Sequence, residues 1–269
     1  MFDSTRSRKT GGGVLRSEVY LTNSYEPEEP VGRSTEINRI ADAVRPLTKR
    51  RQPENLLVHG PSGVGKTTCV KHIFDHLESE TRIKTVYINS WQYNTRSSLL
   101  TELLIQLGYP APRKGKPVDE LLSTIKEWLN KNRGIAVALD EFDQLDDQEV
   151  IYDLQLLNQE ADHHVANILI SNQHPRNLNL DPRSTSRLTM QTLQFKPYTA
   201  PQLKQILEKR VEQAFRPGTV PDKVLEKIAE TVSNQDGDCR QALKKLLRAG
   251  READREGRKG IPPEDASLE

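Results

Sequence analysis

The stretch HGPSGVGKTTC, residues 59–69, contains the most specific pattern in this chain. It fits the phosphate-loop pattern GxxxxGK[ST], with Gly60, Gly65, Lys66 and Thr67 at the required positions. The apolar run NLLVH before it is typical of a short buried strand, and a helical pattern follows it. Strand, loop and helix in that order are the context that this motif requires, so the sequence predicts a loop that holds a phosphate group.

Each residue type in this loop has a physical reason to be there. Glycines let the backbone fold closely around an oxyanion, and the helix that follows adds the positive end of its dipole. We expect Lys66 to reach the β- and γ-phosphates of a nucleotide, and the Thr67 hydroxyl to bind Mg²⁺. The residues expected to bind the nucleotide here are Gly60, Pro61, Ser62, Gly63, Val64, Gly65, Lys66, Thr67 and Thr68.

The composition of the 269 residues is that of a globular protein and limits its function. The 39 basic and 38 acidic residues leave a formal net charge of +1, so any binding to nucleic acid must come from local patches. The sequence contains no apolar run as long as a membrane-spanning helix and no signal-peptide pattern. We therefore expect a cytoplasmic protein without a membrane partner.

The order of the predicted elements indicates an α/β domain followed by a small helical one. Five predicted strands, the first four separated by helical patterns, indicate a parallel sheet covered on both faces, and the strands are NLLVH, KTVYIN, IAVALD, ANILIS and MQTLQF. A helix with Ser34 as its N-cap precedes them, and three helices follow, near 200–214, 221–233 and 238–255. The predicted parts are a flexible basic tail (1–24), the α/β domain (25–198), the helical domain (199–256) and a linker or tail (257–269).

The stretch IAVALDEFD supplies the acidic side chains that a phosphate loop needs to hold its metal ion. Four apolar positions lead into Asp140 and Glu141 at the end of a predicted strand, which is the form of a Walker B motif. Asp140 is expected to hold Mg²⁺, and Glu141 to orient or deprotonate the attacking water. The alternative is a strand that simply ends in an acidic turn.

Three weaker signals follow in the sequence. Asn172 lies at the end of the next strand, where its side chain could bind the attacking water or the γ-phosphate, although Asn is also common in turns. Arg183 and Arg187 lie four residues apart in LDPRSTSRL, a spacing that a solvated surface also explains. Arg240 lies in the first turn of a helix that Asp238 is expected to cap, and a cation at that end suggests an anionic partner.

Taken in order, GPSGVGKT, ALDEFD, LISN, DPRSTSR and GDCRQAL resemble the motifs of the AAA+ ATPases. In that family they are Walker A, Walker B, sensor 1, the arginine-finger region and sensor 2, and the helical tail is the lid. More narrowly, residues 25 to about 260 resemble the archaeal cell-division-control and origin-recognition initiators. The stretches that carry this narrower resemblance are YEPEEPVGR, INSWQYNTRSSLLTELL, LDPR, FKPYTAPQLKQIL and GDCRQALKKLLRAG.

The resemblance implies a role for each of these residues. Lys66, Thr67, Asp140 and Glu141 form the hydrolytic centre, with Asn172 as sensor 1, Arg240 as sensor 2, and Val31 and Gly32 near the adenine. Arg183, with Arg187 as the alternative, is the finger supplied to a neighbouring subunit, which implies self-association through that face. The implied cofactors are ATP or ADP and Mg²⁺.

The resemblance also implies which residues are candidates for contact with DNA. Residues 91–113 correspond to a helical insertion by which such initiators contact DNA, and the candidate contacts are Arg96, Arg113 and Lys114. Packing against the sheet is the favoured interpretation for most of this segment, because LLTELLIQLG is an amphipathic helix. Initiators of this family continue into a winged-helix domain, whereas this sequence ends at EGRKGIPPEDASLE. We therefore expect weak binding to double-stranded DNA.

The sequence as a whole predicts a slowly hydrolysing AAA+ ATPase that acts in DNA replication initiation, through origin recognition or loading of a replicative helicase, or a shortened relative of such an initiator. One alternative is a clamp-loader or transposition-type remodelling ATPase that uses the same motifs. Another is a regulatory subunit that keeps ADP bound and does not turn over.

Overall fold

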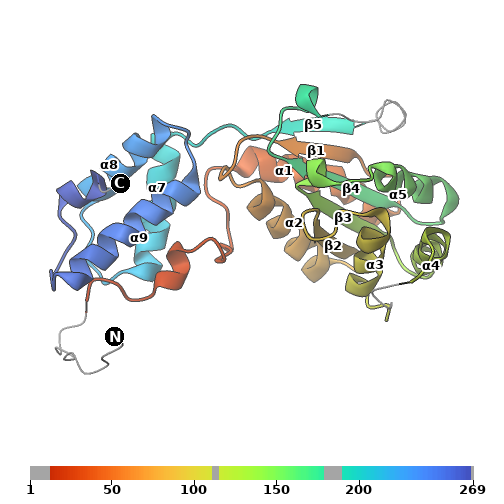
Figure 1. Cartoon of the computed structure of the whole chain (residues 1–269), viewed down its shortest axis with the longest axis horizontal. Coiled ribbons are helices and arrows are strands. Elements are labelled where there is room, and N and C mark those ends of the chain that lie inside the picture. Colours follow the sequence, from red (N-terminus) through yellow and green to blue (C-terminus); the bar gives the residue numbers. More distant parts are fainter. Residues whose placement is uncertain (1–12, 111–114, 179–189, 268–269) are drawn as a thin grey trace. The chain divides into compact units, whose positions relative to one another are not determined.

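The structure of this chain is a computed structural model that describes residues 13–110, 115–178 and 190–267. Its contacts divide the chain into two compact units (Figure 1). Residues 28–196 form an α/β unit, and the described residues before 28 and after 196 form a helical unit.

The α/β unit is built on the five-stranded parallel sheet that the sequence predicts, with strand order β2-β3-β4-β1-β5. The strands are β1 (Asn55–His59), β2 (Lys84–Asn89), β3 (Ile135–Asp140), β4 (Val165–Ser171) and β5 (Met190–Gln194). Every residue of β1, β3 and β4 is buried. Strands with both faces covered are mostly apolar, which explains why the central positions of these three strands are apolar.

Helices cover both faces of this sheet. They are α1 (Ser34–Val44), α2 (Lys66–Glu80), α3 (Arg96–Gln106), α4 (Val118–Lys131) and α5 (Glu149–Glu160), with 3-10 turns η2 (Arg45–Lys49), η3 (Phe142–Gln144) and η4 (Pro175–Asn177). Leu56 packs with α1 and α2, whereas its neighbour Leu57 packs with α3, α4 and α5 on the other face. Because side chains alternate along a strand, the sheet separates two apolar cores.

The start of α1 differs from the prediction. Ser34 is the first helical residue and not the N-cap, which is Arg33. Arg33 is nevertheless held firmly, because its guanidinium donates to Glu36 Oε1 (2.8 Å) and to the carbonyl oxygen of Lys196 (2.6 Å). The position that precedes the helix thus ties α1 to the end of β5.

The helical unit contains the three helices that the sequence predicts. They are α7 (Ala200–Ala214), α8 (Asp222–Ser233) and α9 (Cys239–Arg255). Asp238 caps α9 as expected, since its carboxylate accepts a hydrogen bond from the backbone N–H of Arg240 (2.7 Å).

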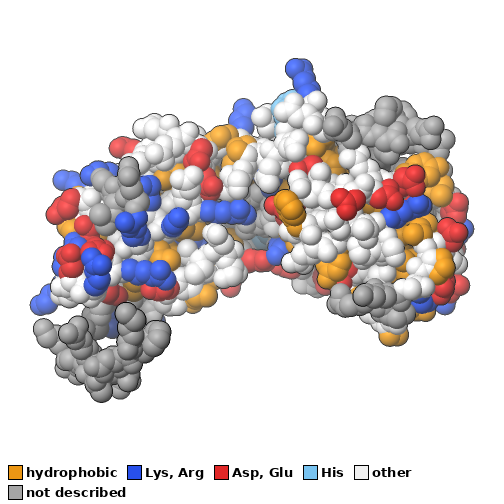
Figure 2. Space-filling view, in the orientation of Figure 1, with side chains coloured by type: hydrophobic (Ala, Val, Ile, Leu, Met, Phe, Trp, Pro, Cys, Tyr) orange, Lys and Arg blue, Asp and Glu red, His pale blue; other side chains and the backbone are white. Residues whose placement is uncertain are grey.

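None of the described helices is both long enough and apolar enough to cross a membrane. Basic and acidic side chains intermingle on the visible face of each unit, in keeping with the net charge of +1 (Figure 2).

Residues 13–24 pack on the helical unit, unlike the mobile tail that the sequence predicts for residues 1–24. Leu15 forms an antiparallel bridge with Phe215, and the short turn η1 (Glu18–Leu21) buries Leu21. The backbone N–H groups of two further residues in this segment donate to the carbonyl oxygen of Ala214. The expected tail is thus partly a structural element of the helical unit, and residues 1–12 lie outside the described part of the chain.

The segment predicted as a linker after residue 256 is also packed. Ile261 is buried and donates its N–H to the carbonyl oxygen of Thr219 (2.9 Å), and the final turn η5 (Pro263–Ser267) packs against α8 and α9. Arg258 pairs with Asp265 at 2.7 Å. The described residues after 256 therefore belong to the helical unit.

Leu21 provides a test of how the N-terminal segment packs. Replacing Leu21, which is 3% exposed, by Ala should lower the free energy of unfolding by about 2–4 kcal/mol, because it leaves a cavity against the lid. Val19→Ala in the same turn is the control, and should change stability by less than about 0.5 kcal/mol because Val19 is 50% exposed. Equal effects of the two substitutions in urea unfolding would show that the segment does not pack as described.

Candidate functional site

The loop between β1 and α2 has glycine at each position where its backbone adopts a positive φ, which are Gly60, Gly63 and Gly65. Gly60 has a φ of +148°, and a Cβ atom there would lie 2.2 Å from the carbonyl oxygen of Phe195. Gly65, just before α2, has a φ of +89°. Side chains with a Cβ atom rarely adopt such angles, so the glycines of the motif allow the backbone to curl tightly at the start of the helix.

Lys66 is the centre of this loop. Its ammonium group is buried and donates to the carbonyl oxygens of Gly60 (2.8 Å) and Pro61 (2.7 Å). It also donates to Oδ1 of Asn172 at 2.8 Å. The structure therefore brings together the phosphate-loop lysine and the strand-end asparagine, which are far apart in the sequence.

Asp140, at the end of β3, receives three hydrogen bonds. The Thr67 hydroxyl donates to its Oδ2 at 2.6 Å, and the Tyr87 hydroxyl donates to the same oxygen at 2.5 Å. The backbone N–H of Glu141 donates to its Oδ1 at 2.9 Å. The predicted Walker B carboxylate is thus held in one orientation, next to the first turn of α2.

The side chains around Asp140 fit a magnesium ion. Thr67 and Asp140 offer hard oxygen ligands that lie within hydrogen-bond distance of each other, beside the loop that would hold phosphates. The described residues contain no group of three or more His, Cys, Asp or Glu arranged for a metal. Mg²⁺ needs no such cluster, because it keeps several waters and binds through one or two carboxylates and the substrate phosphates. Thr67 and Asp140 are therefore the residues that would hold it.

Glu141 follows Asp140 in an uncommon backbone conformation. It has a φ of +53° at the start of η3, and among the described residues only Arg50 shares a positive φ without being glycine. Such conformations cost free energy and cluster at functional sites. Strand β3 ends at Asp140, and the chain turns at Glu141. Glu141 therefore lies at the end of the strand, directly after Asp140.

The segment expected near the adenine is anchored at the same edge of the sheet. Val31 is half-buried and Gly32 is exposed, and both directly precede Arg33, whose guanidinium lies 5.3 Å from the centroid of the Phe195 ring. Phe195 in turn donates its N–H to the carbonyl oxygen of His59 at 2.7 Å, immediately before the phosphate loop. Arg33 thus fixes the position of Val31 and Gly32, a role that the sequence reasoning missed.

His59 and Tyr87 also lie at this site and were not predicted. The ring of His59 lies 5.4 Å from that of His174, centroid to centroid. Burial, together with the nearby His174 and Lys66, lowers the pKa of His59 below its usual value. Burial and the Asp140 carboxylate raise the pKa of Tyr87, so its hydroxyl remains a hydrogen-bond donor. The sequence predicted that Tyr87 lies on the strand KTVYIN but gave no sign of its partner.

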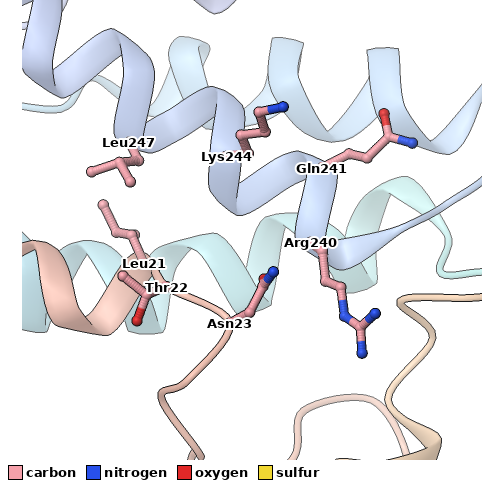
Figure 3. Close-up of a pocket in the computed structure, with 7 residues that line it drawn as sticks. All are labelled: Leu21, Thr22, Asn23, Arg240, Gln241, Lys244 and Leu247. Carbon is pink, nitrogen blue, oxygen red and sulfur yellow. The ribbon is translucent and has the colours of Figure 1, made fainter. Parts of the chain in front are cut away.

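Arg240 belongs to the helical unit and projects from the first turn of α9 (Figure 3). It lines a cavity of about 260 Å³ together with residues of α9 and of the N-terminal segment. The other lining residues are Leu21, Thr22, Asn23, Gln241, Lys244 and Leu247. The cavity exists because the segment after η1 runs along α9.

Arg96 is not free to contact DNA in this structure. Its Nε and one terminal nitrogen bond the two carboxylate oxygens of Asp153 at 2.6 and 2.7 Å, and its other terminal nitrogen lies 2.7 Å from Glu149. The four leucines of α3 are fully buried, which agrees with the packing interpretation; they are Leu99, Leu100, Leu103 and Leu104. Trp91, by contrast, is 66% exposed.

Four predicted residues lie outside the described part of the chain, namely Arg113, Lys114, Arg183 and Arg187.

Comparison with known proteins agrees with this geometry. Residues 49–178 match the family described as AAA domain, and residues 204–267 match the Cdc6 AAA+ ATPase-type lid domain. The chain is 32% identical to the ORC1-type DNA replication protein of Pyrococcus abyssi, covering 91% of this chain and 62% of that protein. It is 30% identical to the ORC1-type DNA replication protein 1 of Sulfolobus acidocaldarius, covering 99% of this chain and 69% of that protein.

A solved structure shows the same fold. The Aeropyrum pernix ORC1 protein, determined in complex with DNA, superposes with a TM-score of 0.80 and 30% identity, over 95% of this chain and 69% of that one. Fold and site thus define a AAA+ nucleotide-binding domain joined to a helical lid. The chain belongs to the family of archaeal ORC1-type DNA replication proteins, and it spans about 62% of the length of several of these relatives.

The lowered pKa of His59 predicts a pH dependence of stability. Because the folded protein resists protonating His59 while the unfolded chain does not, stability should fall as the pH drops from about 7 to about 5. His59→Gln should show a smaller fall in melting temperature over that range. His76→Gln, at an exposed histidine, is the control and should melt like the wild type at both pH values. If His59→Gln loses as much as the wild type, the burial of a neutral His59 is not the cause.

Proposed function

We propose that this chain binds ATP with Mg²⁺ and hydrolyses it slowly, as a switch in the initiation of DNA replication. The observation that carries this proposal is the contact between the Lys66 ammonium and Asn172, beside the Thr67 and Asp140 pair. The Lys66 ammonium, the Asn172 amide and the oxygen atoms of Thr67 and Asp140 then lie close together beside the phosphate loop. That is the set of groups that phosphoryl transfer needs.

The roles follow from the chemistry of each group. Lys66 now shares its three hydrogen bonds among oxygen atoms of the protein, and phosphate oxygens can take their place. Glu141 accepts a proton from the attacking water, and Asn172 holds that water or the γ-phosphate. Mg²⁺, when bound, neutralises charge on the phosphate oxygens. The chain supplies positioning and electrostatics, which carry most of the catalysis in this class of reaction.

The slow rate follows if one catalytic group comes from another subunit. An arginine finger raises the rate of nucleotide hydrolysis by roughly 10³–10⁵. Arg183, or Arg187 as the alternative, is proposed for this role by resemblance, acting in a second copy of the chain. An isolated chain would then hold ATP for long periods, and assembly would trigger hydrolysis.

DNA and a replicative helicase are the partners that this role implies, acting in the cytoplasm. The related Aeropyrum pernix ORC1 protein has been determined in complex with DNA. For the present chain we propose weak binding to duplex DNA, because its net charge is only +1 and Arg96 is neutralised by two carboxylates. Few phosphate contacts give weak binding with a shallow salt dependence.

Separate tests of binding and hydrolysis check the proposal. Glu141→Gln should keep ATP affinity within about threefold and lose turnover by at least about 100-fold, because the metal ligand Asp140 remains while the water loses its base. Lys66→Ala should lose ATP binding itself, as measured by the thermal shift with ATP and Mg²⁺. Lys84→Ala and Glu127→Gln, at exposed side chains, are the controls. ATP binding that survives Lys66→Ala would refute the assigned site.

The DNA part of the proposal has its own test. A salt titration should compare a candidate origin duplex with a shuffled duplex of equal length, with ATP and with ADP. We expect a slope of log affinity against log salt of about −0.9 for each phosphate neutralised, and a preference well below about a thousandfold. A preference for the origin duplex above that level would mean that this chain reads base edges on its own.

A further inference from the structure

Tyr87 connects the metal-binding carboxylate to the edge of the sheet. It lies on β2, an edge strand, and is paired in register with Ala138 of β3. Its hydroxyl donates to Oδ2 of Asp140 at 2.5 Å, the oxygen that also accepts from Thr67. Thr67 is an expected magnesium ligand in the proposed function. Tyr87 is the other donor to this oxygen, and the proposed function gives it no role.

The ring of Tyr87 is fixed as well as its hydroxyl. The Lys71 ammonium, one helical turn after Thr67 on α2, lies 4.7 Å from the centroid of the ring. A cation at this distance from an aromatic face attracts it electrostatically. The phenol is therefore held from the same helix that carries the phosphate-loop residues.

The backbone of Tyr87 is held by a side chain of α3. Because β2 is an edge strand, the N–H and C=O groups of Tyr87 that face away from β3 have no strand partner. Gln106 supplies both bonds, since its Oε1 accepts from the Tyr87 N–H (3.1 Å) and its Nε2 donates to the Tyr87 carbonyl oxygen (3.0 Å). Its Nε2 also donates to Glu102 Oε1 at 3.0 Å, one turn earlier on α3.

We propose that Tyr87 is a positioning residue for Asp140 and that Gln106 holds Tyr87 in place, so that α3 sets the affinity of the site for Mg²⁺. The inference rests on the proposed function and adds a residue and a connection that the motifs do not contain. Outer hydrogen-bond partners of metal ligands fix the orientation of those ligands and thereby tune metal affinity. Here the fixed orientation is that of the Asp140 carboxylate.

This connection gives α3 a route to the nucleotide site. The helix begins after the segment that carries the exposed Trp91, and its first residue, Arg96, is bound to Asp153 and Glu149 of α5. A displacement of α3 pulls Gln106 from Tyr87 and releases one of the three donors on Asp140. The site then binds Mg²⁺ more weakly without any change in the phosphate loop.

The test measures Mg²⁺ dependence directly in the full chain. ADP binding is followed by calorimetry while Mg²⁺ is varied, and again in EDTA. Tyr87→Phe keeps the ring and removes the hydroxyl, so it should raise the half-saturating Mg²⁺ concentration about tenfold. ADP affinity in EDTA should stay within about twofold, because Tyr87→Phe leaves Lys66 and the loop glycines, which would hold the phosphates, unchanged. Tyr109→Phe, at an exposed tyrosine in the same unit, is the matched control.

A second pair of variants tests the α3 connection. Gln106→Met should raise the half-saturating Mg²⁺ concentration about threefold, since it removes two neutral hydrogen bonds that hold Tyr87. Gln92→Met, at an exposed glutamine, should leave it unchanged. An unchanged Mg²⁺ requirement in Gln106→Met would overturn the role of α3, even if Tyr87→Phe behaves as expected.

The outcomes separate this inference from the proposed function. If the wild-type chain binds ADP without any dependence on Mg²⁺, both fail. If the wild type depends on Mg²⁺ and Tyr87→Phe stays within about twofold of it, only the inference fails. The melting temperature of each variant in EDTA, without nucleotide, shows whether it is folded. Should Tyr87→Phe not fold, an unaltered Mg²⁺ requirement in Gln106→Met still overturns the inference.

Discussion

The register of the parallel strands β1, β3 and β4 is the constraint on which the site depends. His59 pairs with Ser171, and Asp140 pairs with Ile170 one position earlier, so the three strands end at one edge of the sheet. The phosphate loop, Glu141 and Asn172 each follow directly from such an end. A slip of one residue would turn every side chain of a strand to the other face and separate Lys66 from Asn172.

Buried amides support this register at the other end of the strands. The Asn167 side chain of β4 donates to Asn55 of β1 at 3.0 Å, and Asn55 donates to Gln155 of α5 at 3.1 Å. All three residues are buried. A shifted register would break these hydrogen bonds, and each buried amide group left without a partner costs about 1–3 kcal/mol. The polar residues inside the sheet thus select the alignment that assembles the site.

The sequence predicted the strands, the loop and the three lid helices because each depends on a local pattern. The contact between Lys66 and Asn172 depends on β1 and β4 being neighbours, which the structure shows and the sequence analysis did not predict. The role of Tyr87 was not predicted either, because its partner lies on another strand and a strand pattern does not name it. The packing of residues 13–24 was missed for a similar reason, since this polar segment is held by lid residues such as Phe215 near the other end of the sequence. Contacts between residues far apart in the sequence were the part that local patterns did not contain.

The hydrogen bonds of Gln106 have a second physical consequence, which concerns other chains. An edge strand with open N–H and C=O groups can add a strand from another molecule and so begin aggregation. On β2, the backbone N–H and C=O groups of Tyr87 form hydrogen bonds with the Gln106 side chain of α3. The N–H of Thr85 donates to Glu78 of α2 at 2.8 Å. Side chains from helices on opposite faces of the sheet therefore close this edge. A foreign strand could extend the sheet beyond β2 only by displacing both.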